Sequence, residues 1–265
     1  MHIDVKSLNK LQYIRQGKPS LKQFLQIALL PCGQTLYVWG GGWNEEDTGA
    51  GSDAVTLGLN PGWKEFFDKQ ASSYDFHAHR FAFGCGLDCS GYVGWVLYNL
   101  LEQESGKEGY VSKASTMAKD LAERGLGTFI PYERVDHYAV GDIVSIEGHI
   151  FICIGECEDT SIVLLHSSPQ AGVQISGTVR NGETLCTDQL PSGEEKSEAW
   201  HLADKAMKTC FPACSAVFPT KYCDERYRKG SIMRWDLEGE KVIEDREGLS
   251  HLAPLNVLEI ILSKT

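Results

Sequence analysis

Three short β-rich runs lie between residues 142 and 175, and they constrain the fold more than any other feature of the chain. The runs 142–146 and 149–154 are separated only by Glu147-Gly148, a dipeptide that favours a two-residue hairpin. A third run covers 162–167. Strands joined by such short connections pair antiparallel. The sequence therefore predicts an antiparallel sheet at the centre of the fold.

Amphipathic helices are predicted on both sides of these strands along the chain. The expected helices cover 20–30, 63–70, 88–104, 115–125 and 254–262, and further strands are expected at 36–42, 173–175 and 232–235. Ser20 is the expected cap of the first helix, and Ser115 that of the fourth. Helices combined with an antiparallel sheet indicate a single α+β domain over residues 1–265.

Composition and charge restrict the classes of function. The chain is 42% hydrophobic and 23% charged, which is typical of a soluble globular protein with a sizeable core. Its net charge of -11 argues against nucleic acid, because binding phosphates requires clustered Lys and Arg. The longest apolar run, 24–30, is too short to span a membrane and lacks a cleavage site. As given, the chain is expected in the cytoplasm, or outside it if a leader was trimmed.

The nine cysteines are an odd number, which fits a reducing compartment better than a disulfide scaffold. Six of them form three Cys-x-x-x-Cys pairs, which are Cys85 with Cys89, Cys153 with Cys157, and Cys210 with Cys214. Structural zinc sites usually contain Cys-x-x-Cys instead. His77 and His79 lack a third ligand nearby. We therefore expect no metal and no cofactor, and interpret these thiols as buried.

Cys89 is the candidate nucleophile because it opens the helix predicted at 88–104. The N–H groups of a first helical turn lower the pKa of a thiol, and an imidazolium nearby does the same. Ser90 and Gly91 are small enough to admit a substrate, and the Cys89 N–H can face an oxyanion. His149, at a strand start, is the candidate base, and His166 could orient it. Taken singly, each of the three also fits a structural residue.

Four segments together resemble the NlpC/P60 family of bacterial cell-wall peptidases. They are Tyr37-Val-Trp-Gly-Gly41, Leu87-Asp-Cys-Ser-Gly-Tyr92, 140–155 with Gly148-His149 inside it, and Leu164-Leu-His-Ser-Ser168, and they occur in the family's order. The resemblance covers residues 36–176. It implies a papain-like fold with the nucleophile's helix packed on the sheet. In that fold Cys89 attacks an amide carbonyl, His149 shuttles the proton and His166 orients the imidazole.

The resemblance also implies substrate-binding residues and a substrate class. Tyr37 matches a family tyrosine whose hydroxyl lies near the thiol, and Asp88 and Ser90 match positions that contact the peptide. The expected substrate is a peptidoglycan stem peptide, cut between γ-linked D-glutamate and a diamino acid, and a soluble murein-derived peptide is preferred over intact wall. The sequence specifies no oligomeric state. The chain departs from the family in a long insertion, 43–84, and in a C-terminal extension, 177–265, of unknown role.

Three other interpretations stay open from the residues. A papain-like amidase or acyltransferase would use the same thioester on another substrate. A catalytically idle binding module would keep the fold and use the insertion for a partner. A metal-binding or redox protein would use the Cys-x-x-x-Cys pairs. The presence of Cys89, His149 and His166 together favours the enzyme.

Overall fold

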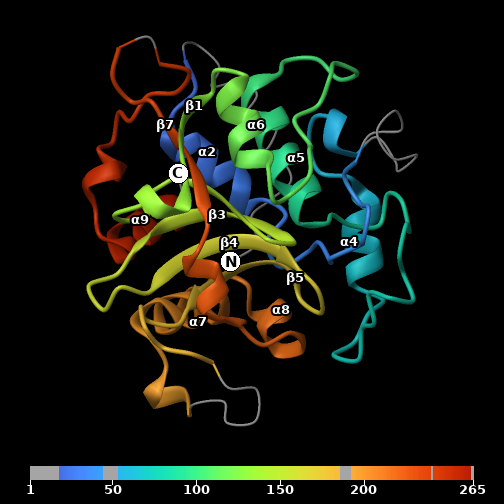
Figure 1. Cartoon of the computed structure of the whole chain (residues 1–265). Coiled ribbons are helices and arrows are strands. Elements are labelled where there is room, and N and C mark those ends of the chain that lie inside the picture. Colours follow the sequence, from blue (N-terminus) through green and yellow to red (C-terminus); the bar gives the residue numbers. More distant parts are fainter. Residues whose placement is uncertain (1–17, 44–52, 186–191, 240, 264–265) are drawn as a thin grey trace.

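A computed structural model describes residues 18–43, 53–185, 192–239 and 241–263 of the chain. Within these ranges one seven-stranded sheet has the order β1-β7-β2-β3-β4-β5-β6. The strands are β1 (Gly127–Ile130), β2 (Ile143–Ile146), β3 (His149–Glu156), β4 (Ile162–Ser168), β5 (Gly172–Thr178), β6 (Tyr222–Cys223) and β7 (Ser231–Trp235). Figure 1 shows β3, β4 and β5 side by side in the middle of the molecule.

The helices are α2 (Leu21–Leu29), α4 (Pro61–Phe67), α5 (Cys89–Leu101), α6 (Met117–Glu123), α7 (Glu198–Cys210), α8 (Pro212–Val217) and α9 (Pro254–Leu262). Short 3-10 turns are η1 (Asp53–Val55), η2 (Tyr132–Arg134), η3 (Gly193–Glu195), η4 (Glu225–Arg228) and η5 (Leu249–His251). This combination confirms the α+β class. The sheet is mixed instead of wholly antiparallel, because β6 pairs parallel to β5.

The predicted hairpin at Glu147-Gly148 is confirmed. Ile146 pairs with His149 across the turn, and Gly148 has a φ of +73°, a backbone conformation that glycine adopts without strain. His149 is therefore the first residue of β3. Its side chain lies at the end of the strand and is buried.

The two faces of the sheet pack against different parts of the chain. Side chains alternate along a strand, so Ile150 and Ile152 point to one face and Phe151 to the other. The first face joins a large apolar core with helices α5, α7 and α9. The second face carries a smaller cluster of Phe151, Leu164, Tyr138 and Tyr227. His149 and His166 also lie on the second face, because His149 is two residues from Phe151 and His166 is two residues from Leu164 on their strands.

Helix α5 is almost completely enclosed, with twelve of its thirteen residues buried. It begins at Cys89, as predicted, because the Asp88 carboxylate accepts a hydrogen bond from the Gly91 N–H and caps the helix. It ends at Leu101, three residues before the predicted boundary. The glycine turn at residues 40–42 lies against its first turn, and the Gly41 carbonyl faces Gly91.

Several other predicted elements are confirmed. Ser20 caps α2 with a full capping box, α9 covers 254–262, and β4, β5 and β7 contain the three further predicted strands. Helix α4 lies within the insertion and, as Figure 1 shows, at the periphery. Helix α6 begins after Thr116 instead of Ser115. The strand predicted at 36–42 is wrong: only Leu36 pairs, with Gly86, because the partner segment turns directly into α5.

The extension 177–265 contributes two strands of the sheet and three helices. Strand β7 lies between β1 and β2, and β6 extends the sheet beyond β5. Helices α7 and α8, drawn in orange in Figure 1, lie side by side, and α7 packs on β5. None of the helices in the described ranges has the length and apolarity to cross a bilayer.

We predict that Gly91→Ala severely destabilises the protein. A Cβ at this position would lie 2.0 Å from the Gly41 carbonyl oxygen, which is fixed backbone. Overpacking costs about 1–3 kcal/mol where neighbours can move and more where they cannot. Chemical denaturation should show a loss above about 3 kcal/mol.

Gly94→Ala is the matched control in the same helix. Its Cβ would lie 2.3 Å from Val111 Cγ2 and 3.1 Å from the Val111 backbone nitrogen, so this variant is destabilised too, but by less, because its closest contact is with a side chain and not with fixed backbone. The gain in helix propensity is the same in both variants. An unfolding free energy for Gly91→Ala equal to that of Gly94→Ala would contradict the close packing of the glycine turn.

Candidate active site

The Cys89 thiol lies where the first turn of α5 meets the beginning of β3. The backbone N–H of Ile150, the residue after His149, is directed at its sulfur, as is the N–H of Ser90. The side chain is only 6% exposed. The fold thus brings Cys89 next to the start of β3, and the pairing of its thiol with His149 stays a prediction.

The two histidines form a hydrogen-bonded chain on the second face of the sheet. His149 Nε2 lies 3.0 Å from His166 Nδ1, and His166 Nε2 lies 3.0 Å from Ser176 Oγ. If the Nε2 atoms carry the protons, each imidazole donates to the next acceptor and His149 Nδ1 is left unprotonated. His149 then has one basic nitrogen available for the thiol, which is the arrangement that a general base requires.

Burial keeps the Cys89 thiol and the His149 imidazole uncharged in the resting protein. It raises the pKa of Cys89 to about 12, and the negative charge of Asp88 raises it further, against the opposing N–H groups. It lowers the pKa of His149 to about 3, with a further contribution from Lys221 and Arg226. Burial and the neighbouring His149 hold the pKa of His166 well below its usual range. The depressed thiol pKa expected from the helix N-terminus is therefore wrong for the resting state.

Asp88 connects three parts of the site. Its two oxygens accept hydrogen bonds from the Gly40 N–H at 3.2 Å, the Trp43 indole at 2.8 Å, the Ser90 hydroxyl at 3.0 Å and the Gly91 N–H at 2.7 Å. Burial raises its pKa to about 6 in spite of these donors. The geometry gives Asp88 and Ser90 a role in positioning the thiol, and their contact with substrate stays a prediction.

Tyr37 lies on the same side as the thiol. Burial raises the pKa of its hydroxyl, and so do the charges of Cys89 and Asp88, which places the three groups close together. Its ring packs edge-on against Phe76 at 5.5 Å, and its carbonyl accepts a hydrogen bond from the Tyr74 hydroxyl. The hydroxyl therefore keeps its proton and can donate a hydrogen bond to an acceptor beside Cys89.

The sequence did not reveal four further residues of the site. Trp43 also reaches Ser90 Oγ at 3.1 Å, and Ser176 ends the histidine chain. Lys221 and Arg226 bring positive charge near His149 from the extension. Ser176 lies on the second face of the sheet. A serine is unusual in a buried strand, so its position in the sequence could have indicated a polar partner there. The sequence of residues 221–226 gives no sign that Lys221 and Arg226 lie near His149, because only the fold brings them together.

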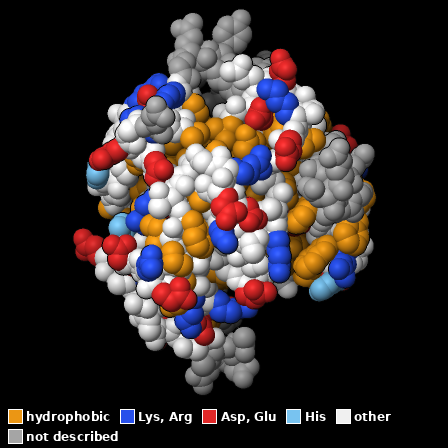
Figure 2. Space-filling model, turned by 45° about the horizontal axis from the view of Figure 1, so that its top comes forward, with side chains coloured by type: hydrophobic (Ala, Val, Ile, Leu, Met, Phe, Trp, Pro, Cys, Tyr) orange, Lys and Arg blue, Asp and Glu red, His pale blue; other side chains and the backbone are white. Residues whose placement is uncertain are grey.

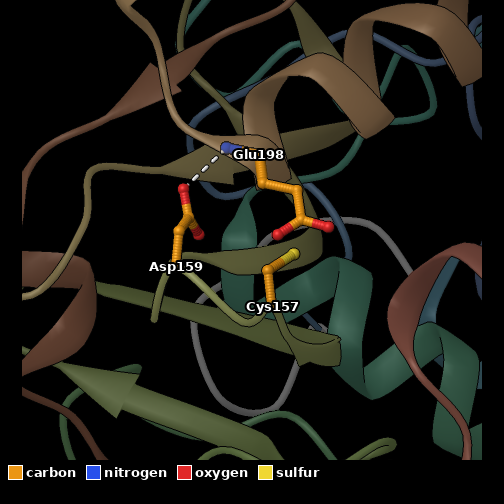
Figure 3. A group of neighbouring side chains, drawn as sticks. All are labelled: Cys157, Asp159 and Glu198. Carbon is orange, nitrogen blue, oxygen red and sulfur yellow. Dashed lines mark hydrogen bonds between the residues drawn. The ribbon is translucent and has the colours of Figure 1, made fainter.

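A second group of metal-ligand atoms lies on the other side of the sheet, at the N-terminus of α7. Cys157, Asp159 and Glu198 have ligand atoms within 4.8 Å of one another. Figure 3 shows these three side chains as neighbours. Asp159, however, already accepts hydrogen bonds from the Ser161 N–H and hydroxyl, the Arg180 guanidinium and the Glu198 N–H. Burial raises the pKa of Cys157 to about 12. We interpret this cluster as the link that joins the β3–β4 turn to α7.

The remaining candidate ligands have structural surroundings. The eight cysteines that the structure describes form no disulfide with one another, and Cys186 lies outside the described residues. His79 stacks on the Tyr74 ring at 5.4 Å, and His77 contacts Phe76 at 3.9 Å. His77 is exposed and His79 is partly buried.

Comparison with known proteins does not assign the chain to a family. No protein-family model, curated protein or solved structure matches it. The functional assignment therefore depends on the residues of the site and on the resemblance of its motifs.

We predict that the folded protein loses stability as the pH falls below 6.5 because of the buried histidines. A histidine whose pKa is lowered by folding binds a proton only when unfolded, so stability is complete above pH 6.5 and is lost toward the folded pKa. Between pH 7.5 and 5 each histidine should contribute a loss of about 2 kcal/mol.

The measurement is urea unfolding across this range for the wild type and for His149→Gln/His166→Gln. The difference between the two unfolding free energies isolates the histidines from the carboxylates, Asp88 included. A difference that is constant with pH would show that the imidazoles are not buried in the neutral form.

Proposed function

We propose that the chain is a cysteine peptidase of the NlpC/P60 type, with a papain-like fold, that hydrolyses amide bonds in peptidoglycan stem peptides. The observation that supports this most is the thiol of Cys89 at the first turn of α5, against the start of β3, whose first residue, His149, is hydrogen-bonded to His166. A thiol, a base and a group that orients the base are the three components of nucleophilic catalysis by cysteine.

The first half of the reaction forms a thioester. When the substrate carbonyl lies against Cys89, His149 Nδ1 accepts the thiol proton as sulfur attacks the carbonyl carbon. Negative charge develops on the carbonyl oxygen, where the Cys89 N–H and the Tyr37 hydroxyl can donate hydrogen bonds. The C–N bond then breaks, and the amine leaves with the proton from His149. The acyl group stays on sulfur.

The second half restores the enzyme. His149 accepts a proton from water, and the hydroxide attacks the thioester carbonyl. The C–S bond breaks, and sulfur takes the proton back from the imidazole. Because both groups are neutral before substrate binds, the thiolate exists only during attack. The Nε2–H of His149 donates a hydrogen bond to Nδ1 of His166, and this hydrogen bond stabilises the imidazolium of His149 as it forms.

The preferred substrate is a short soluble peptide that contains γ-D-glutamyl linked to a diamino acid. The bond is inferred from the resemblance of the motifs. The preference for a free peptide is supported by burial, since Cys89 and His149 are 6% and 8% exposed and leave little room for a polymer. Figure 2 shows one face of the molecule, on which acidic and basic side chains are interspersed among apolar ones.

The test is hydrolysis of L-Ala-γ-D-Glu-diamino acid peptide by the wild type, Cys89→Ala, His149→Gln and Cys85→Ala. We expect the first two variants to lose about 10³-fold or more in kcat/KM, because one removes the nucleophile and the other the base. Cys85→Ala is the matched control, since it removes the other thiol of the same Cys-x-x-x-Cys pair.

The outcomes separate the remaining interpretations. Cleavage of other amides or esters, with the same dependence on Cys89, would keep the thiol hydrolase and replace the substrate. Transfer of the acyl group to an added amine in preference to water would identify an acyltransferase. Equal activity of Cys89→Ala and the wild type on every substrate that is turned over would reject the mechanism.

A further inference from the structure

Tyr227 contacts both histidines of the site from the C-terminal extension. Its ring centroid lies 5.3 Å from that of His149 and 5.8 Å from that of His166, with interplanar angles of 58° and 75°. Its hydroxyl is close enough to Cys89 for the charge of the thiolate to raise its pKa, although burial is the main cause. One side chain thus touches the orienting residue and the base and lies near the nucleophile.

The ring of Tyr227 is itself held in place. It stacks on Phe151 at 5.6 Å with an interplanar angle of 30°, and it is only 6% exposed. Phe151 follows His149 by two residues on β3, so the same strand positions the base and supports the ring. Tyr227 belongs to η4, which follows β6, the strand that pairs with β5 next to His166.

The imidazole of His149 needs such a support. Its only hydrogen bond to a side chain in the described structure is the one to His166. A ring held at one nitrogen can still rotate about its last side-chain bond, and a rotation would remove Nδ1 from the thiol. A misplacement of about 1 Å in a reacting group can cost about 100-fold in rate.

We propose that Tyr227 is a positioning residue whose ring keeps His149 turned toward Cys89 and excludes water from the pair, so that the C-terminal extension completes the active site. This inference rests on the proposed function in assigning His149 as the base. The titratable and charged groups around His149 are His166 from β4, and Tyr227, Lys221 and Arg226 from the extension, while the Cys89 sulfur from α5 accepts from the N–H of the next residue, Ile150. Arg226 is paired with Asp224.

The test compares Tyr227→Ala and Tyr227→Phe with the wild type in three measurements. They are peptide hydrolysis, the rate of iodoacetamide alkylation at pH 7 by intact mass, and the titration of the His149 ring by NMR. For Tyr227→Ala we expect kcat to fall at least about tenfold with KM changed less than about twofold, because orientation and not binding is lost.

In Tyr227→Ala the rate of Cys89 alkylation and the pKa of His149 should both increase, whereas kcat falls. Water that enters the space of the ring stabilises the charged forms, so alkylation of Cys89 should accelerate at least about fivefold. For the same reason the pKa of His149 should rise toward its ordinary value of about 6.5. Tyr227→Phe keeps the ring and should behave like the wild type in all three.

Tyr138→Ala is the control for a loss of packing alone. Tyr138 is buried in the same cluster as Tyr227, but its hydroxyl binds the carbonyls of Arg228 and Gly230 instead of contacting the histidines. This variant should lose stability and keep the kcat and the His149 titration of the wild type. The same three changes in Tyr138→Ala would overturn the proposal.

Two further outcomes are decisive. If Tyr227→Ala unfolds, all nine thiols become reactive, and Tyr227→Leu then replaces it, with a loss of kcat expected because leucine cannot fill the flat space. A folded Tyr227→Leu or Tyr227→Ala that matches the wild type in every measurement would overturn the role. If the wild type does not cleave the peptide, the proposed substrate fails, while alkylation and NMR still decide the role of Tyr227.

Discussion

The hydrogen bonds to the Asp88 carboxylate fix the start of α5 and with it the thiol around which the site is arranged. One carboxylate caps α5 and at the same time binds the glycine turn at residue 40 and the indole of Trp43. Burying a charge costs several kcal/mol unless donors replace water, and here four donors do so. Cys89 is the next residue, so the interactions that start the helix also place the thiol. Because Gly91 has no side chain, the glycine turn at residues 40–42 can contact the first turn of α5.

The histidines depend on a different part of the chain. Strands β3 and β4 supply His149 and His166, but the side chain that covers both rings on the second face of the sheet is Tyr227, which comes after the motif core. This cover makes the site dry, and a dry site favours neutral groups. In the proposed mechanism the base therefore acts when substrate arrives, because the resting thiol and imidazole do not form an ion pair. The extension is thereby part of the site and not an appendage to it.

The sequence predicted the elements whose signals are local. Asp88 marked the start of α5, Glu147-Gly148 marked the hairpin, and periodicity marked α9. It failed where a segment depends on a distant partner. Residues 36–42 have the composition of a strand, yet only Leu36 finds a partner, and β1 forms because β7 pairs with it. The candidate triad could be read from motif order, whereas Tyr227, Lys221 and Arg226 reach the histidines only through the parallel pairing of β6 with β5.

The place of β7 in the sheet has a consequence for how the chain is made. Residues 231–235 lie between β1 and β2, which precede them by almost a hundred positions. A ribosome that has released only the earlier strands therefore presents two unpaired edges, and one of them carries the buried Ile143 and Val144. Exposed apolar edges pair readily with other chains. Until residues 231–235 are synthesised, the sheet of the growing polypeptide therefore stays open between β1 and β2.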